Sequence, residues 1–252
     1  ITSDIVNYPG VLEDSGEGLT QKMRQQAQNF GATFQKATVK KLLLDQPIKK
    51  IETDQGTFET IGLVLATGAH PRQLGFPGEK EYQGRGIAYC ATCDGEFFEG
   101  CQLFVIGGGF AACEEAKPPH ITNGGSDTLE YAVFRNNKDQ STWRYDAKNG
   151  RFGIFVFAGY VPENALFKDQ LKVNPQGYLL TDRHQKTSQD GVYGAGDICE
   201  KDLRQVVTAV SDGAIAATSL EKYITSTKEK YHIETVAYYN KTDIKKSSHN
   251  ND

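Results

Sequence analysis

Several features that define other classes of protein are missing from this sequence. No stretch approaches the roughly 20 apolar residues that cross a bilayer, and residues 1–4 lack the charged and apolar regions of a signal peptide. A large excess of positive or negative charge is also missing, because 28 basic side chains against 32 acidic ones leave a formal net charge of -4. That balance gives no large field to attract phosphate backbones or anionic lipid. We therefore expect a soluble cytoplasmic protein without membrane or nucleic acid partners.

Cysteine is scarce, and five residues are too few for a disulfide scaffold of this length. Only Cys90 and Cys93 are closely spaced, and in a reducing compartment such a pair indicates a catalytic or a metal-binding site. A zinc site needs two more ligands, whereas Cys101, Cys113 and Cys199 stand alone. We expect these three to be small buried apolar side chains. Half of a zinc site and a passive structural pair stay open as alternatives for the close pair.

Glycine is abundant, and one supersecondary pattern occurs twice. The first copy, about 33–71, has β-rich segments at 33–44 and 48–53 and then the apolar run 63–66. The second copy starts near 128 and ends in the apolar run 154–158. Continuous apolar runs of this length suit strands that are covered on both faces. We predict an α/β fold with two doubly wound, Rossmann-like dinucleotide-binding domains, each with a β-meander; the alternative is chance similarity of two meanders.

Between the two copies, an apolar strand at 103–106 leads directly into a GxGxxA turn. Gly107 permits the tight turn, Gly109 lets the backbone approach a pyrophosphate, and Ala112 allows close helix packing, with Gly108 between the two glycines. The motif predicts a dinucleotide site, with a glycine-rich structural turn as the alternative.

The chain after this motif is unusual, because Pro118 and Pro119 follow only about two helical turns later. A parallel crossover needs a dozen or more residues before its next strand. We therefore expect that residues of the complete fold are missing near Lys117 and before Ile1.

The segment around Cys90 and Cys93 carries the chemistry. Two intervening residues let the thiols close a small disulfide ring, and the pairing can lower the pKa of one thiol from its usual value near 8.5. Asp94 directly follows and is placed to protonate a departing thiolate, a role that requires a raised carboxyl pKa.

Segment 84–95, GRGIAYCATCDG, resembles the active-site segment of the low-molecular-weight, bacterial-type thioredoxin reductases. Three further blocks resemble the same family in the same order: 7–10 its flavin-contacting loop, 66–69 its central ATG turn and 191–197 its late FAD motif. The family's Arg-Gln-Val segment and small-residue helix follow at 204–206 and 212–217. Together the matches span most of residues 1–224.

The resemblance implies a flavin-dependent thioredoxin-disulfide reductase that uses FAD and NADPH and forms a homodimer. It implies a split FAD-binding domain, 1–88 and 189–225, and an inserted NAD(P)H-binding domain, 89–188, that carries the CxxC; the tail 226–252 has no assigned role. Cys93 would face the flavin, Cys90 would attack the disulfide of a thioredoxin or thioredoxin-like protein, and Asp94 would be the acid. The implied flavin-site residues are Asn7, Thr67, Gly68, Ala69, Gly196, Asp197, Arg204, Gln205 and Val206.

The sequence departs from the family pattern in two places. The amino-terminal GxGxxG that seats the FAD pyrophosphate is absent, and so is the basic cluster that clamps the NADPH 2′-phosphate. NADH and ferredoxin therefore stay open as electron donors. Two other functions also stay open: a related flavoenzyme acting on another disulfide or as a dithiol oxidase, and a non-catalytic remnant that binds a partner but no flavin.

Overall fold

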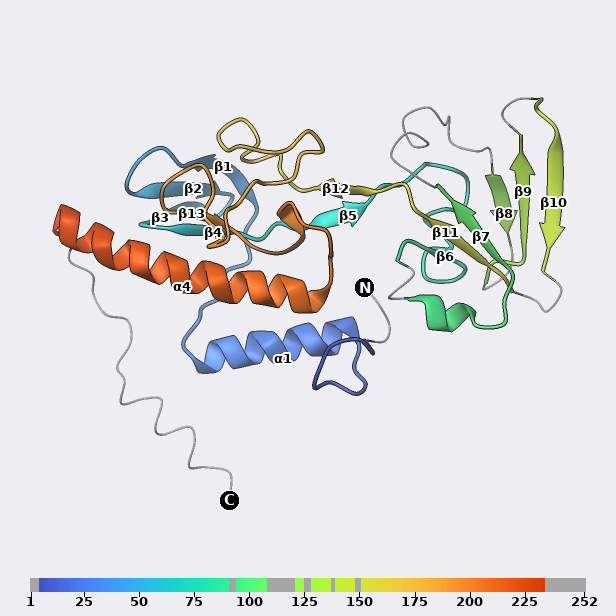
Figure 1. The fold of residues 1–252 in the computed structure, drawn as a ribbon, viewed down its shortest axis with the longest axis horizontal. Coiled ribbons are helices and arrows are strands. Elements are labelled where there is room, and N and C mark those ends of the chain that lie inside the picture. The colour runs from blue at the N-terminus through green and yellow to red at the C-terminus, as the bar shows by residue number, and fades with distance from the viewer. Residues whose placement is uncertain are drawn as a thin grey trace, which may run out of the picture. The chain divides into compact units, whose positions relative to one another are not determined.

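The computed structural model describes residues 5–90, 94–107, 121–124, 128–136, 139–147 and 151–233. The chain forms two compact units. One comprises residues 1–15 and 70–161 and is called here the Cys90 unit; the other comprises 16–69 and 162–252 and is called the Asp197 unit. The chain crosses between them at strands β5 (Ala69–Pro71) and β12 (Tyr160–Pro162), which pair as a two-stranded sheet (Figure 1).

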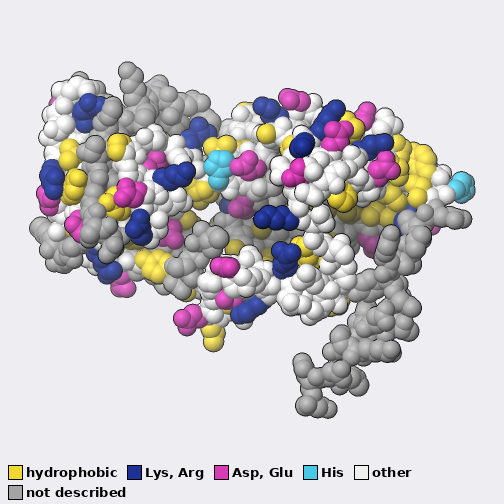
Figure 2. Space-filling model, turned by 180° about the vertical axis from the view of Figure 1, so that it is seen from behind, with side chains coloured by type: hydrophobic (Ala, Val, Ile, Leu, Met, Phe, Trp, Pro, Cys, Tyr) yellow, Lys and Arg dark blue, Asp and Glu magenta, His cyan; other side chains and the backbone are white. Residues whose placement is uncertain are grey.

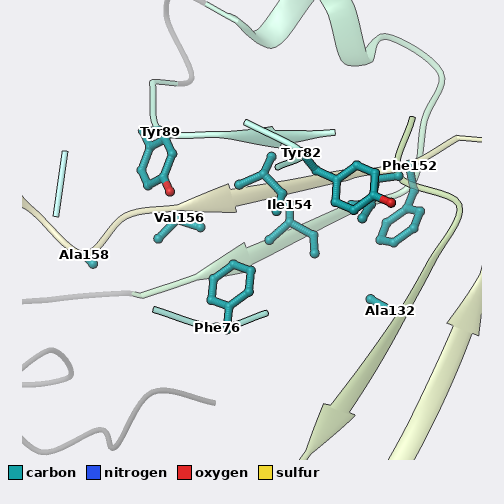
Figure 3. Packing of buried hydrophobic residues seen from close by; sticks show 10 residues of the cluster. Phe76, Tyr82, Tyr89, Ala132, Phe152, Ile154, Val156 and Ala158 are labelled. Carbon is teal, nitrogen blue, oxygen red and sulfur yellow. The ribbon is translucent and has the colours of Figure 1, made fainter. Parts of the chain in front are cut away.

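The Cys90 unit is built on a parallel sheet in the order β6-β11-β7. Its strands are β6 (Ile87–Ala88), β7 (Leu103–Ile106) and β11 (Gly153–Val156), and β11 is buried along its whole length. An antiparallel meander, β8 (Ile121–Gly124), β9 (Tyr131–Arg135) and β10 (Thr142–Asp146), belongs to the same unit. Side chains from β11 lie at the centre of the core, with Phe76, Tyr82 and Phe152 around them (Figure 3).

The Asp197 unit contains a second meander and a second parallel pair. The meander is β1 (Val39–Leu43), β2 (Lys49–Thr53) and β3 (Gly56–Thr60), and the parallel strands are β4 (Leu63–Leu65) and β13 (Val192–Gly194). Helix α4 (Val206–Tyr231) packs on β4 and β13 through Ala216, which is fully buried, and Leu220; helix α1 (Gly16–Asn29) precedes the meander.

The predicted architecture of two α/β units, each with parallel strands and a β-meander, is confirmed. Two strand positions differ from the expectation. The second meander begins at Ile121 and not near 128, and the first strand of the first meander begins at Val39 and not at 33. Thr-Asn-Gly in β8 gives no apolar signal, and the hydrogen-bonded ladder of β1 starts only where Val39 lies opposite Thr53 on β2.

The unit boundaries also lie elsewhere than the expected bounds of 1–88 with 189–225 and 89–188. Residues 70–88 belong to the Cys90 unit because β6 pairs with β11. Residues 162–188 belong to the Asp197 unit because Phe167, Leu171 and Leu179 pack in one core with Leu42 and Val192.

The expected tail 226–252 begins too early. Helix α4 continues without a break to Tyr231, so residues 226–231 belong to this helix. The helix ends where His232 adopts a left-handed backbone conformation, with φ 51°, and donates its N–H to Lys228 O. Residues 234–252 lie outside the described part of the chain.

The surface mixes charges of both signs. On the face drawn in Figure 2, Lys and Arg side chains are interspersed with Asp and Glu. Among the residues that the structure describes, no helix combines the length and the apolar character that a membrane span requires.

Candidate active site

Cys90 lies two residues after the short strand β6, and it is disulfide-bonded. Cys101 and Cys199 are free. Cys199 is buried as expected, and burial raises the pKa of its thiol to about 11, so that it stays protonated at neutral pH. Cys101 is only half-buried, which differs from the expectation, while Cys93 and Cys113 lie outside the described residues.

Asp94 belongs to the same turn as Cys90. Its backbone N–H donates to the carbonyl oxygen of Cys90 at 3.0 Å, and η1 (Gly95–Phe98) follows. Burial raises the pKa of the Asp94 carboxyl, and a backbone hydrogen bond at Cys90 acts in the opposite direction. A carboxyl group with a raised pKa holds its proton closer to neutral pH, which is what a general acid requires.

A cavity of about 300 Å³ opens beside Asp94, within the Cys90 unit. Its walls combine two guanidinium groups with three aromatic rings and the glycine-rich turn before β6. It is lined by Gly84, Arg85, Gly86, Ala88, Asp94, Phe97, Phe98, Thr128, Arg151 and Phe152. Phe97 is 45% exposed, so an apolar side chain stands at the surface next to the acid. Cationic and aromatic walls suit a protein loop better than a small apolar molecule.

In the Asp197 unit, the predicted flavin residues follow two paired strands. Because β4 and β13 run parallel, with Leu65 opposite Gly194, their carboxyl ends meet at the same edge of the sheet. The turn with Thr67 and Gly68 and the turn with Asp197 therefore lie at that edge, where open α/β sheets bind their ligands. The Thr67 hydroxyl donates to Glu163 O at 2.7 Å, which fixes the first turn.

The second turn contains a buried carboxylate oxygen, on Asp197, that no described residue bonds to. Gly196 has φ 78°, which turns the chain into η2 (Gly196–Ile198). Oδ1 of Asp197 is buried and has no hydrogen-bond partner in the described chain. Burial raises the pKa of Asp197, and the positive charges of Lys201 and Arg204 offset part of the rise. A buried acceptor without a donor is costly unless a ligand supplies one.

Asp212, on α4, holds the Asp197 turn in place. Its Oδ2 accepts the Gly196 N–H at 3.0 Å and pairs with the Lys201 ammonium, and its Oδ1 accepts from Gln185 Nε2 at 3.1 Å. The carboxyl and ammonium side chains of the pair are each only 14% exposed. The sequence places Asp212 in a small-residue helix and gives it no role. Its signal is a charged residue inside the otherwise small and apolar run VVTAVSDGAIAA.

Comparisons with known proteins agree with this geometry. The family model described as pyridine nucleotide-disulphide oxidoreductase matches residues 3–120 and 122–213. A thioredoxin reductase of Peptoclostridium acidaminophilum is 40% identical over 91% of this chain and 86% of that protein, and one of Bacillus subtilis is 32% identical over 90% and 84%. The crystal structure of a thioredoxin reductase from Streptococcus pyogenes is 30% identical and superposes with a TM-score of 0.77, over 89% of this chain and 85% of the other.

This chain belongs to the pyridine nucleotide-disulphide oxidoreductase family. Within the family its relatives are thioredoxin reductases, which confirms the resemblance found in the sequence and makes the chain an enzyme, a flavin-dependent oxidoreductase.

The remaining residues predicted for the flavin site lie at the start of helix α4. The Arg204 guanidinium stacks over the Tyr178 ring at 4.0 Å, and its buried Nε has no hydrogen-bond partner among the described residues. Gln205 is the N-cap and forms a capping box with Thr208, so that Val206 is the first helical residue. The helix start places partial positive charge near the Asp197 turn.

Two predicted residues fall outside this cluster. Asn7 is exposed and belongs to the Cys90 unit, so its flavin contact stays a prediction. Ala69 begins β5, at the crossing between the units.

The predicted nucleotide fingerprint is described only at its first glycine. Gly107 has φ 104°, and a Cβ added there would lie 2.4 Å from the carbonyl oxygen of Phe157. Only glycine fits this close approach between the ends of β7 and β11. Gly108, Gly109 and Ala112 lie outside the described residues. In the part of the chain that is described, no group of three or more His, Cys, Asp or Glu is arranged to hold a metal ion.

Proposed function

We propose that this enzyme is a thioredoxin-disulfide reductase that passes electrons from NADPH, through FAD and a Cys90–Cys93 disulfide, to a thioredoxin or thioredoxin-like protein. The observation that carries the proposal is the Cys90 turn. Cys90 is disulfide-bonded, and the same turn holds Asp94, a carboxyl group whose pKa is raised by burial. One hydrogen bond of 3.0 Å, from the Asp94 N–H to the Cys90 carbonyl oxygen, thus joins the backbones of the residues that carry the proposed redox sulfur and the proposed acid.

Cys93 is the partner that we assign to Cys90. Of the five cysteines, Cys101 and Cys199 are free, which leaves Cys93 and Cys113. The two-residue spacing of Cys90 and Cys93 is that of redox-active pairs with a lowered thiol pKa.

The proposed transfer to the substrate has two steps. The Cys90 thiolate attacks one sulfur of the substrate disulfide, the substrate S–S bond breaks, and the departing thiolate takes a proton from Asp94. The Cys93 thiolate then attacks Cys90 in the mixed disulfide, which releases the second substrate thiolate for protonation and restores the enzyme disulfide. The substrate gains two electrons, which the two enzyme thiolates lose, and two protons, one from Asp94 and one from solvent.

The residues of the Asp197 unit fit a flavin. The buried Asp197 Oδ1 and the buried Arg204 Nε are an acceptor and a donor that lack protein partners among the described residues. Asp197 would accept from a hydroxyl of the FAD sugar chain, and the turn of Thr67 and Gly68 would border the cofactor from the neighbouring strand. When bound, the flavin supplies the electron pair that reduces the enzyme disulfide.

For the electron donor we propose a nucleotide bound at the fingerprint that starts with Gly107, with NADPH as the preferred form. The positive φ of Gly107, 104°, suits the tight turn for which the fingerprint needs its first glycine. For the protein substrate we propose the cavity beside Asp94, since a substrate loop seated there brings its disulfide near the acid. The homodimer and the cytoplasmic location implied by the sequence stay predictions.

The test separates the two thiols. Cys93→Ser keeps the attacking sulfur but cannot resolve the mixed disulfide, so it should accumulate a covalent complex with a thioredoxin that lacks its own second cysteine. Cys90→Ser should form none, and both variants should lose steady-state reduction of thioredoxin. The parent enzyme is assayed with NADPH, NADH and reduced ferredoxin to define the donor.

A covalent complex with Cys90→Ser but not with Cys93→Ser would reverse the two roles. Full thioredoxin reduction by either variant would remove the pair from the catalytic centre.

A further inference from the structure

The buried carboxylate of Glu79 bonds to Tyr89, the residue directly before Cys90. Glu79 is 3% exposed, and its oxygens accept three hydrogen bonds. Oε1 accepts the Leu74 N–H at 3.0 Å and the Tyr89 hydroxyl at 2.8 Å, and Oε2 accepts the Gly75 N–H at 2.6 Å. Within the described ranges no Lys or Arg forms an ion pair with Glu79. Hydrogen bonds alone therefore compensate for the removal of this carboxylate from water.

Tyr89 connects Glu79 to Cys90, because it bonds to the first and directly precedes the second in the chain. Its ring is 7% exposed and packs in the core with Phe76, Val156 and Ala158 (Figure 3). Burial raises the pKa of the Tyr89 phenol, and the hydrogen bond that its hydroxyl donates to Glu79 raises this pKa further. The carbonyl oxygen of Tyr89 accepts a long hydrogen bond of 3.4 Å from the Tyr160 hydroxyl. The Cα of Cys90 follows one peptide unit, about 3.8 Å, later. The position of the disulfide-bonded residue is thus tied to a side chain held at its far end.

We propose that Glu79 and Tyr89 act together as positioning residues that hold the Cys90 disulfide in the geometry that favours its closed form. This role rests on the proposed redox function of Cys90. A disulfide tolerates only a narrow range of Cβ separations and dihedral angles. Its stability relative to the dithiol therefore depends on how firmly the fold holds each cysteine near bonding geometry, which is an effective-concentration effect.

The measurement is the thiol–disulfide equilibrium of Cys90 in the full chain. The protein is equilibrated with defined ratios of reduced and oxidised dithiothreitol, free thiols are alkylated, and the alkylated fraction of the Cys90 peptide is measured by mass spectrometry. Tyr89→Phe removes only the hydroxyl, so the equilibrium constant for disulfide formation should fall roughly three- to tenfold, a rise of about 15–30 mV in potential. Glu79→Gln should shift it in the same direction.

Tyr82→Phe is the matched control, because it also removes a hydroxyl from a tyrosine of the same core, 4% exposed, and keeps Tyr89, whose hydroxyl donates to Glu79. It should leave the Cys90 equilibrium unchanged. The double variant Glu79→Gln/Tyr89→Phe should shift the equilibrium no further than the larger single change, since both changes act on the same hydrogen bond, one by weakening its acceptor and one by removing its donor.

An unchanged equilibrium in Tyr89→Phe overturns the proposal, as does an equal shift in Tyr82→Phe or additive shifts in the double variant. If Glu79→Gln does not fold, Tyr89→Phe against Tyr82→Phe decides the question. Because the equilibrium is measured without flavin turnover or thioredoxin, a parent enzyme that fails to reduce thioredoxin refutes the proposed function and leaves this test intact.

Discussion

Asp212 and Glu79 are both carboxylates that hold a functional turn, one in each unit of the chain. Asp212 pairs with the Lys201 ammonium and is 14% exposed, whereas Glu79 is almost fully buried and, among the described residues, accepts hydrogen bonds from two backbone N–H groups and a phenol. The ion-paired anchor contains a charge that becomes uncompensated when its partner is removed. The hydrogen-bonded anchor has no such partner, so its loss is felt locally, at Cys90. Both carboxylates thus hold a turn in place, but we expect the loss of an ion-pair partner to lower overall stability and the loss of the hydrogen-bonded carboxylate to act locally.

The difference between the two anchors is tested most directly at Lys201, the cation that pairs with Asp212. Lys201→Met leaves the Asp212 carboxylate without its cation and should lower the free energy of unfolding by about 3 kcal/mol, because one half of a mostly buried pair is lost. The exposed pair Lys186–Asp190 is the control; Lys186→Met should cost under about 1 kcal/mol. Urea unfolding followed by circular dichroism measures both.

The double variant Lys201→Met/Asp212→Asn tests the stated cause. Asn keeps an oxygen for the Gly196 N–H and removes the charge, so most of the lost stability should return. If the double variant is as unstable as Lys201→Met, the cost lies in packing and not in an uncompensated charge.

A second prediction concerns Asp94, whose burial has opposite effects on catalysis and on stability. Asp94→Asn should lower the turnover number for thioredoxin reduction by about 10²-fold, the usual contribution of general acid catalysis. The parent's turnover should decline as pH rises through the raised pKa of Asp94, and the variant should lack that decline.

The stability effect has the opposite sign. Because the folded-state pKa of Asp94 is raised above its unfolded value, this group favours folding at acid pH and loses that contribution as pH rises through the folded pKa. Asp94→Asn should therefore raise the melting temperature at neutral pH while it lowers activity. A parallel fall in both would identify Asp94 as a structural residue.

The sequence predicted the parts of this molecule that depend on local pattern. The apolar runs at 63–66 and 154–158 mark the parallel strands β4, which is half-buried, and β11, which is fully buried, and the CxxC-Asp spacing places Cys90 and Asp94 in one turn. Strand β8 was missed because Ile-Thr-Asn-Gly forms a strand only through its pairing with β9. The tail was expected to begin at 226 because the family resemblance stops near 224, although Lys-Glu-Lys at 228–230 favours a helix and α4 continues to Tyr231.

The two anchors could not be predicted, for a physical reason. Glu79 meets Tyr89 only because the turn at 74–79 folds back on the strand end before Cys90, and Lys201 meets Asp212 only because the chain after η2 returns along α4. Neither pair has a helical or strand spacing, so periodicity carries no signal for it.

The smallest expected effect, and the one that best separates a ligand role from a structural one, is at Asp197. Asp197→Ala removes the acceptor that we assign to a flavin hydroxyl, and the loss of a hydrogen bond to a charged group, about 1.5–3 kcal/mol, corresponds to roughly ten- to a hundredfold weaker flavin binding. Asp197→Asn keeps one acceptor oxygen and should lose less, within about tenfold. Fluorescence titration of flavin-free protein with FAD measures both affinities. The control is Asp202→Asn, which changes an exposed carboxylate in the same loop.

In flavin-free protein, the Asp197→Asn variant should be more stable than the parent. Oδ1 of Asp197 is buried without a partner among the described residues, and burial raises the pKa of the carboxyl group. Asp197→Asn therefore removes an unfavourable buried charge and should raise the melting temperature at neutral pH. Weaker flavin binding together with a more stable flavin-free protein is the signature of a carboxylate retained for a ligand. If Asp197→Asn instead destabilises the flavin-free chain and leaves FAD affinity unchanged, Asp197 supports the turn and the flavin lies elsewhere.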